Sequence, residues 1–120
     1  MGRNYEYAAT TDPIKLSTFS MQSARDSLLE VLRETRALLA RPGNDFAWST
    51  WDNAVAALYE LDSFIFYIET ERPFDGSKLS ILFAPTADIQ EVSESSGWGA
   101  EFCRVAERFD FAFAQYKSTL

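Results

Sequence analysis

Residues 78–95 read KLSILFAPTADIQEVSES, and this stretch decides the fold class of the chain. In its first half the large apolar side chains Leu79, Ile81 and Phe83 stand at every second position, a spacing typical of a strand that buries one face. Pro85 follows and marks a turn, because proline favours turn positions and has no amide hydrogen. The first half therefore predicts a strand that ends in a turn.

The second half, residues 88–95, is most simply the return strand of a hairpin. Its alternation is imperfect, because Ile89 and Val92 stand three positions apart. A β-bulge restores the phase of a strand, but a short helix capped by Thr86 explains the spacing equally well. The sequence thus predicts a β-hairpin at about residues 78–94, with a short helix over its second half as the alternative.

Three other segments carry apolar residues three and four positions apart, the period of an amphipathic helix. They predict helices at about residues 18–41, 46–71 and 98–117. Pro42 and Gly43 end the first helix, and Asn44 or Asp45 can cap the second. The second helix is apolar on most sides, which is typical of a central helix covered on two faces.

Together these elements predict a single domain, residues 1–120, of class α+β and mostly helical, with the order α-α-β-β-α. Three helices form the core, the hairpin is inserted between the second and third helices, and residues 1–16 form an N-terminal arm. A two-stranded hairpin is stable only when it packs on something, so it should lie against the helices. Leu28, Leu58 and Val105 are expected near the centre of the core.

The composition excludes most catalytic chemistry. The chain has 120 residues, with one cysteine and no histidine. Ser/His/Asp and Cys/His nucleophilic systems, mixed zinc sites and histidine-containing di-iron sites are therefore excluded within one chain. The remaining carboxylate, lysine, tyrosine and thiol groups fall in no recognisable motif. We therefore expect no metal and no cofactor, and the sequence favours a protein that is not an enzyme.

The negative charge is concentrated in the middle of the chain. Residues 42–95 hold ten acidic and two basic side chains, a net charge of -8, whereas the segments before and after them carry +1 and 0. Such a surface repels nucleic acids and anionic membranes and attracts basic proteins, although acidity is also an ordinary feature of solubility. The sequence predicts a basic protein partner that binds segment 42–95. The expected contacts are Asp88, Glu91 and Glu94 on the hairpin, and Glu60 and Glu71 on the second helix.

Two carboxylates, Asp62 and Glu69, stand within the apolar arc of the second helix. A carboxylate turned into a core costs several kcal/mol unless it is paired or protonated. One interpretation is a shielded acid in a small-ligand pocket beside Trp98, at the corner where the third helix begins. The other is structural: an ion pair with an arginine, or exposure near the helix end. The candidate arginines are Arg25, Arg36, Arg104 and Arg108.

The third helix carries a large apolar side chain, Phe111, opposite its buried stripe. Cys103 and Ala114 flank it on the same outer side. Two-fold pairing of identical chains is the commonest way to cover such a side chain. We therefore expect a homodimer that forms through Phe111, Cys103 and Ala114.

Three functions remain open. The first is a non-enzymatic interaction protein, an acidic inhibitor, immunity-type factor, adaptor or chaperone that binds a basic partner through residues 42–95. The alternative is a small-ligand-binding protein or minor enzyme that uses Asp62 or Glu69 near Trp98, and the third is a self-associating structural subunit. The missing histidine and the absence of a phosphate-binding loop favour the first. With no signal peptide and no apolar run long enough to span a bilayer, the chain is expected in the cytoplasm.

Overall fold

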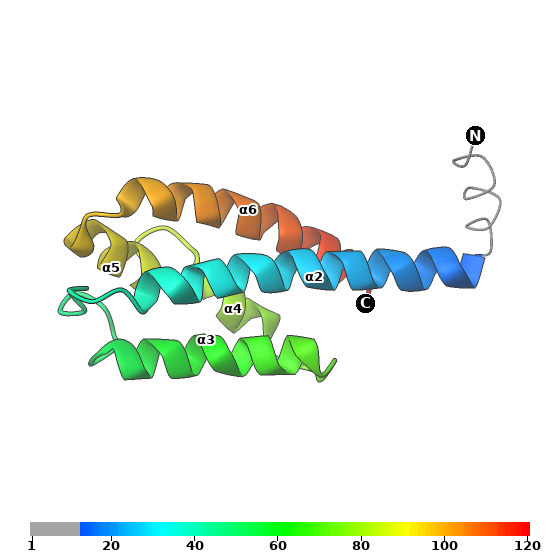
Figure 1. The fold of residues 1–120 in the computed structure, drawn as a ribbon, viewed down its shortest axis with the longest axis horizontal. Coiled ribbons are helices and arrows are strands. Elements are labelled where there is room, and N and C mark those ends of the chain that lie inside the picture. Colours follow the sequence, from blue (N-terminus) through cyan, green and yellow to red (C-terminus); the bar gives the residue numbers. More distant parts are fainter. Residues whose placement is uncertain (1–12) are drawn as a thin grey trace.

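The computed structural model describes residues 13–120, with side chains from residue 21 onward. Within this range the chain forms five helices and no strand (Figure 1). They are α2 (Pro13–Leu39), α3 (Ala54–Glu69), α4 (Gly76–Leu82), α5 (Asp88–Ser96) and α6 (Gly99–Ser118). The predicted arm lies outside the described residues except for residues 13–16, which belong to α2. The predicted α+β class is wrong, because the described residues are helical in both places where strands were expected.

The predicted first strand is helix α4. Asp75 caps this helix, because its Oδ1 accepts hydrogen bonds from two amides of the first turn, at 3.0 and 3.3 Å. Leu79 and Leu82, three positions apart, are both buried, whereas Ile81 is 61% exposed. Burial therefore follows the period of a helix and not the alternation of a strand.

The predicted return strand is helix α5. Ile89, Val92 and Ser93 are buried, at the spacing of one side of a helix. The helix ends at Gly97, whose φ of 86° is a left-handed conformation that glycine adopts without strain, and whose amide donates to the Ser93 carbonyl. The alternative of a short helix over the second half is therefore confirmed, and the hairpin at residues 78–94 is wrong. Thr86 does not cap this helix, because its hydroxyl donates to the Pro85 carbonyl and the N-cap position is Ala87.

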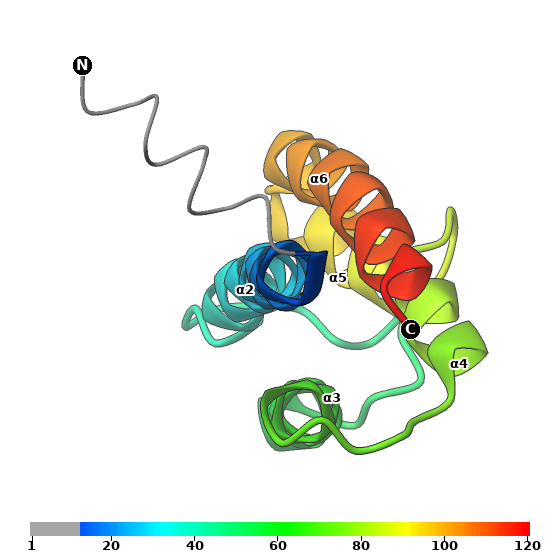
Figure 2. The ribbon, with the colours of Figure 1, turned by 90° about the vertical axis from the view of Figure 1, so that its right-hand side faces the viewer.

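The central element is α2 and not the predicted second helix. α2 packs against α3 on one side and α6 on the other, and Figure 2 shows it end-on between them. Leu28 and Val105, on α2 and α6, are buried as predicted. No helix within residues 13–120 has an apolar stretch long enough to cross a membrane.

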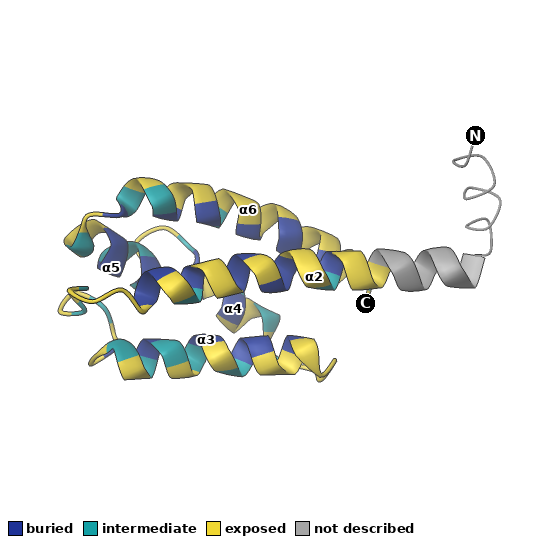
Figure 3. Ribbon diagram, viewed as in Figure 1, coloured by how far each residue is buried: buried dark blue, intermediate teal, exposed yellow. Residues whose placement is uncertain are grey.

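The second predicted helix begins later than expected, at Ala54 rather than residue 46. Asn53 is its cap, and the side-chain oxygen of Asn53 accepts a hydrogen bond from the amide of Ala56 at 3.1 Å. Leu58 is only half-buried, because α3 is covered on one side alone. Figure 3 shows its buried residues toward α2 and α4 and its exposed residues on the other side. The buried residues are Ala57, Leu61, Phe64, Ile65 and Ile68.

Asn44 ends α2 instead of capping the next helix. Its Nδ2 donates to the carbonyl oxygens of Leu38 and Leu39, at 2.9 and 3.0 Å, and so satisfies two acceptors of the last turn. Its Oδ1 accepts the indole N–H of Trp98 at 2.8 Å. One side chain thus joins the end of α2 to the start of α6.

The core contains an aromatic cluster between α6 and the end of α4. The rings of Phe109 and Phe83 are stacked, with centroids 4.0 Å apart and planes 8° from parallel. Phe113 lies 5.3 Å from Phe109 on the same helix. Phe109 is 2% exposed. This cluster ties the α4–α5 connection to α6.

Candidate functional site

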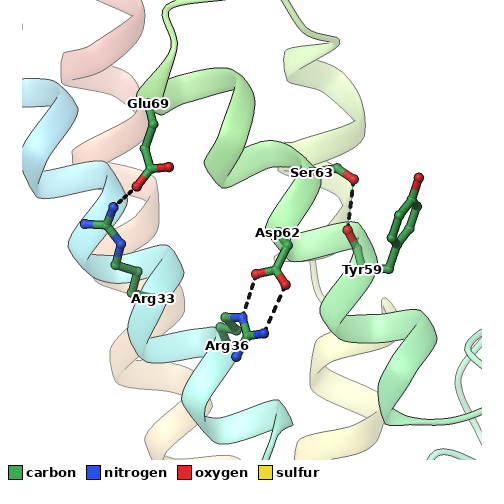
Figure 4. Close-up of polar contacts among 6 residues, drawn as sticks. All are labelled: Arg33, Arg36, Tyr59, Asp62, Ser63 and Glu69. Atoms are coloured by element: carbon green, nitrogen blue, oxygen red, sulfur yellow. Dashed lines mark hydrogen bonds and ion pairs between the residues drawn. The ribbon is translucent and has the colours of Figure 1, made fainter.

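One edge of α3 is held to α2 by two ion pairs (Figure 4). Arg36 donates from Nε to Asp62 Oδ1 at 2.5 Å and from Nη2 to Oδ2 at 3.0 Å, a two-pronged geometry. Arg33, about one turn before Arg36 on α2, donates to the carboxylate of Glu69, about two turns after Asp62 on α3. The hydrogen bond to Asp62, with its negative charge, raises the pKa of the Arg36 guanidinium above its usual value. Both acids therefore bind α2 and are not directed into the core.

The predicted pocket residues do not meet in one place. Asp62 and Glu69 face α2, and their side chains are 48% and 43% exposed. Trp98 is buried at the corner between α5 and α6, where its indole binds Asn44. The structural interpretation of an arginine pair holds for Asp62 and Arg36, one of the predicted partners. Glu69 pairs with Arg33, which the sequence analysis did not name.

Because both members of the Asp62–Arg36 pair are exposed to solvent, the pair should contribute little to stability. We expect Asp62→Asn to lower the free energy of unfolding by at most about 1 kcal/mol, as is usual for exposed pairs. Urea unfolding of the two proteins measures this difference. A loss of more than about 3 kcal/mol, the effect of breaking a buried pair, would contradict the exposed arrangement.

The side of α3 that faces away from α2, next to these acids, is apolar and exposed. Val55 and Tyr59 are 75% and 74% exposed, and Phe66 and Tyr67 follow about two turns after Tyr59. The ring of Tyr59 points away from α2, while its main-chain oxygen accepts the Ser63 hydroxyl at 2.9 Å (Figure 4). We call Val55, Tyr59, Phe66 and Tyr67 the α3 aromatic face. Contiguous apolar side chains of this kind mark interaction surfaces.

A cleft of about 1020 Å³ adjoins this face, between α3 and the segment that leads into α4. Tyr59 and Tyr67 line it from α3, and Phe74 and Lys78 line it from the other side. Glu60 also lines it and accepts the indole N–H of Trp51 at 2.9 Å. We call this space the α3–α4 cleft. It offers apolar walls with a few charged groups, the usual composition of a binding site.

The predicted acidic contacts fall into two groups. Asp88 accepts hydrogen bonds from the amide and hydroxyl of Thr50, at 2.9 and 2.5 Å, and Glu60 binds Trp51. Glu71 lies beyond the end of α3 and pairs with Arg25 at 3.1 Å. Glu91 and Glu94 lie on α5, and among the described residues they take part in no ion pair. The first three acids thus have structural partners.

The residues of the predicted dimer contact lie on the outer side of α6. Phe111 is 68% exposed, and Cys103 and Ala114 are exposed as well. Phe111 borders a shallow cavity of about 450 Å³ between α6 and α2. Self-association through these residues stays a prediction. Among the described residues, no three acidic or cysteine side chains lie close enough to hold a metal ion.

The α3 aromatic face is the surface that the sequence analysis missed. The available signal was the width of the apolar arc of this helix, which was interpreted as burial on two sides. When only one neighbour covers such a helix, part of a wide arc is left in water. The number of neighbours is a tertiary property, and the hydrophobic pattern of one helix does not contain it.

Comparisons of the chain with known protein families, with curated proteins and with solved structures found no match.

Proposed function

We propose that this protein is a non-enzymatic interaction protein that binds a protein partner through the α3 aromatic face and the α3–α4 cleft. The observation that carries the proposal is the exposure of Tyr59 and its neighbours on a helix that is covered on one side alone. Tyrosine and tryptophan dominate the binding energy of protein interfaces, because they bury a large area with few rotatable bonds. Trp48, 74% exposed in the segment before α3, adds a further aromatic side chain.

The charge of the surrounding segment favours a basic partner. Of the ten acidic residues in segment 42–95, three are paired with arginines of α2. The other seven have no such pair within the described residues, and only Arg72 and Lys78 oppose them. Glu91 and Glu94 add to this field, which raises the association rate of a cationic partner. The partner should therefore present aliphatic or aromatic side chains together with lysine or arginine.

This chemistry suits an acidic inhibitor, an immunity-type factor, an adaptor or a chaperone. The ion pairs of Asp62 and Glu69 count against the alternative of a small-ligand-binding protein or minor enzyme that uses these carboxylates. The lone exposed thiol of Cys103 supports a reducing compartment such as the cytoplasm as the place of this binding.

A random peptide library displayed on phage tests the proposal with the purified protein. Selected peptides should be enriched in lysine or arginine together with apolar residues. Tyr59→Ala should weaken the binding of such a peptide at least about 10-fold, because a central aromatic contact is lost. Fluorescence anisotropy with the synthetic peptide measures the Kd, and added salt should slow association.

Phe111→Ala is the matched control, since it removes an exposed aromatic ring from another helix. Its Kd should equal that of the unmodified protein within about twofold, because it lies outside the predicted interface. The proposal is wrong if the library yields no peptide, if the enriched peptides are acidic, or if Tyr59→Ala binds as tightly as the control.

A further inference from the structure

A second cavity, of about 460 Å³, lies at the other end of α6 from Trp98. It is bounded by α2, the last turns of α6 and the connection between α3 and α4. Met21, Phe74 and Phe113 supply apolar walls, and the ring of the largely buried Tyr116 supplies another. We call it the basic cavity, for the side chains described next.

Among the described residues, three cationic side chains line the basic cavity against one carboxylate side chain. The carboxylate of Glu71 pairs with Arg25 at 3.1 Å. The guanidinium of Arg72 lies 5.4 Å from the centre of the Phe66 ring, and the ammonium of Lys117 lies 4.7 Å from that of Phe113. Neither Arg72 nor Lys117 has a carboxylate within 4 Å among the described residues.

This excess of positive charge stands out against the charge of the whole chain. The protein carries a net charge of -7, and Arg72 is one of only two basic residues in segment 42–95. Aromatic rings hold Arg72 and Lys117 in place by cation–π contact, which leaves their charge unneutralised. An anion that enters this cavity therefore meets two positive groups that no carboxylate side chain of the described residues pairs with.

The walls around these cations are well defined. A Cβ atom at Gly76 would stand 3.2 Å from Cζ of Phe113, so the ring edge packs directly on the glycine backbone. Tyr116 is 7% exposed, and its hydroxyl forms no hydrogen bond with the described residues. Burial raises the pKa of this hydroxyl, Arg25 opposes the rise and Glu71 adds to it. The hydroxyl thus stays protonated at neutral pH and is a hydrogen-bond donor.

We propose that the basic cavity binds a small carboxylate with an apolar body, its carboxylate between Lys117 and Arg72 and its body against Met21, Phe74 and Phe113. The cavity has the volume of an ordinary small-molecule site. Its apolar walls favour an anion with an apolar body over a strongly hydrated one such as inorganic phosphate, because phosphate gains nothing from apolar contact. The basic cavity adjoins the α3–α4 cleft and shares Arg72, Pro73 and Phe74 with it, whereas Lys117 lines the basic cavity alone of the two spaces.

Matched pairs of an acid and its neutral alcohol test the proposal. Octanoate and 4-phenylbutyrate are titrated into the isotope-labelled full chain, and octanol and 4-phenylbutanol serve as neutral partners of equal length. At least one of the acids should bind with a Kd below about 1 mM, which is ordinary for ligands of this size. Its affinity should exceed that of its alcohol at least about 5-fold, because the alcohol gains no charge contact.

Lys117→Met removes one charge and keeps the apolar stem. It should therefore weaken the binding of the acid about 3- to 10-fold and leave the affinity for the alcohol unchanged. Arg104→Met, which removes an exposed charge elsewhere on α6, should bind the acid like the unmodified protein. The proposal is overturned if neither acid binds or if acid and alcohol bind with equal affinity. It is also overturned if Lys117→Met and Arg104→Met lose affinity for the acid to the same extent. Peptide binding at Tyr59, measured separately, decides the proposed function.

Discussion

Replacement of Phe109 by alanine is expected to lower the free energy of unfolding by about 3 to 5 kcal/mol, the usual effect of removing a buried phenylalanine ring. Phe109 is 2% exposed and stacks on Phe83 with ring centroids 4.0 Å apart. Its removal leaves Phe83 without the ring that joins the α4–α5 connection to α6. Urea unfolding followed by circular dichroism measures the loss.

Phe111→Ala is the control on the same helix, two positions away and 68% exposed. Its effect should stay within about 0.5 kcal/mol, as for most surface substitutions. If Phe109→Ala unfolds the chain completely, Phe109→Leu keeps much of the apolar volume and should give a smaller, measurable loss. Equal losses in Phe109→Ala and Phe111→Ala would contradict the orientation of α6.

The second large effect is expected at Leu61, which is fully buried where α3 packs on the core. Leu61→Ala should lower the free energy of unfolding by about 2 to 5 kcal/mol, because apolar surface is no longer buried and a cavity remains. Leu58 lies one turn earlier and is half-buried. Leu58→Ala should therefore lower the free energy of unfolding by only about 1 kcal/mol. The same unfolding measurement compares the two variants.

The reverse order of these losses would show that α3 is rotated about its axis. Such a rotation would bury part of the α3 aromatic face and remove the basis of the proposed function. The leucine pair therefore tests the orientation on which Tyr59 depends, without any partner. The two leucine variants also distinguish the observed fold from the fold predicted from the sequence, in which Leu58 lies near the centre of the core.

The helical periods of α2 and α6 could be predicted from the sequence, because apolar residues recur three and four positions apart along both segments. Residues 78–84 could not be assigned in this way, since a short apolar run satisfies both a strand and a buried helix. The deciding residue is Asp75, which precedes this run and is the N-cap of α4. For residues 88–96, the spacing of Ile89 and Val92 fitted a bulged strand and a short helix equally well, and Gly97, the left-handed C-cap of α5, belongs to the helix.

The candidate site could be predicted only in part. The arginine partner of Asp62 was anticipated because a carboxylate in an apolar arc needs a counter-ion. The exposure of Tyr59 was not anticipated, because it depends on which helix lies at the centre of the bundle. The basic cavity joins Arg25, Arg72 and Lys117 from three distant parts of the sequence, and no local pattern brings them together.

The central claim is that a partner binds the exposed side of α3, and chemical-shift mapping tests it most directly. The selected peptide is titrated into the isotope-labelled protein, and the amide shifts are followed residue by residue. The largest changes are expected at the α3 aromatic face and along the α3–α4 cleft. Changes confined to Glu91 and Glu94 on α5, or to Cys103, Phe111 and Ala114 on α6, would contradict the claim.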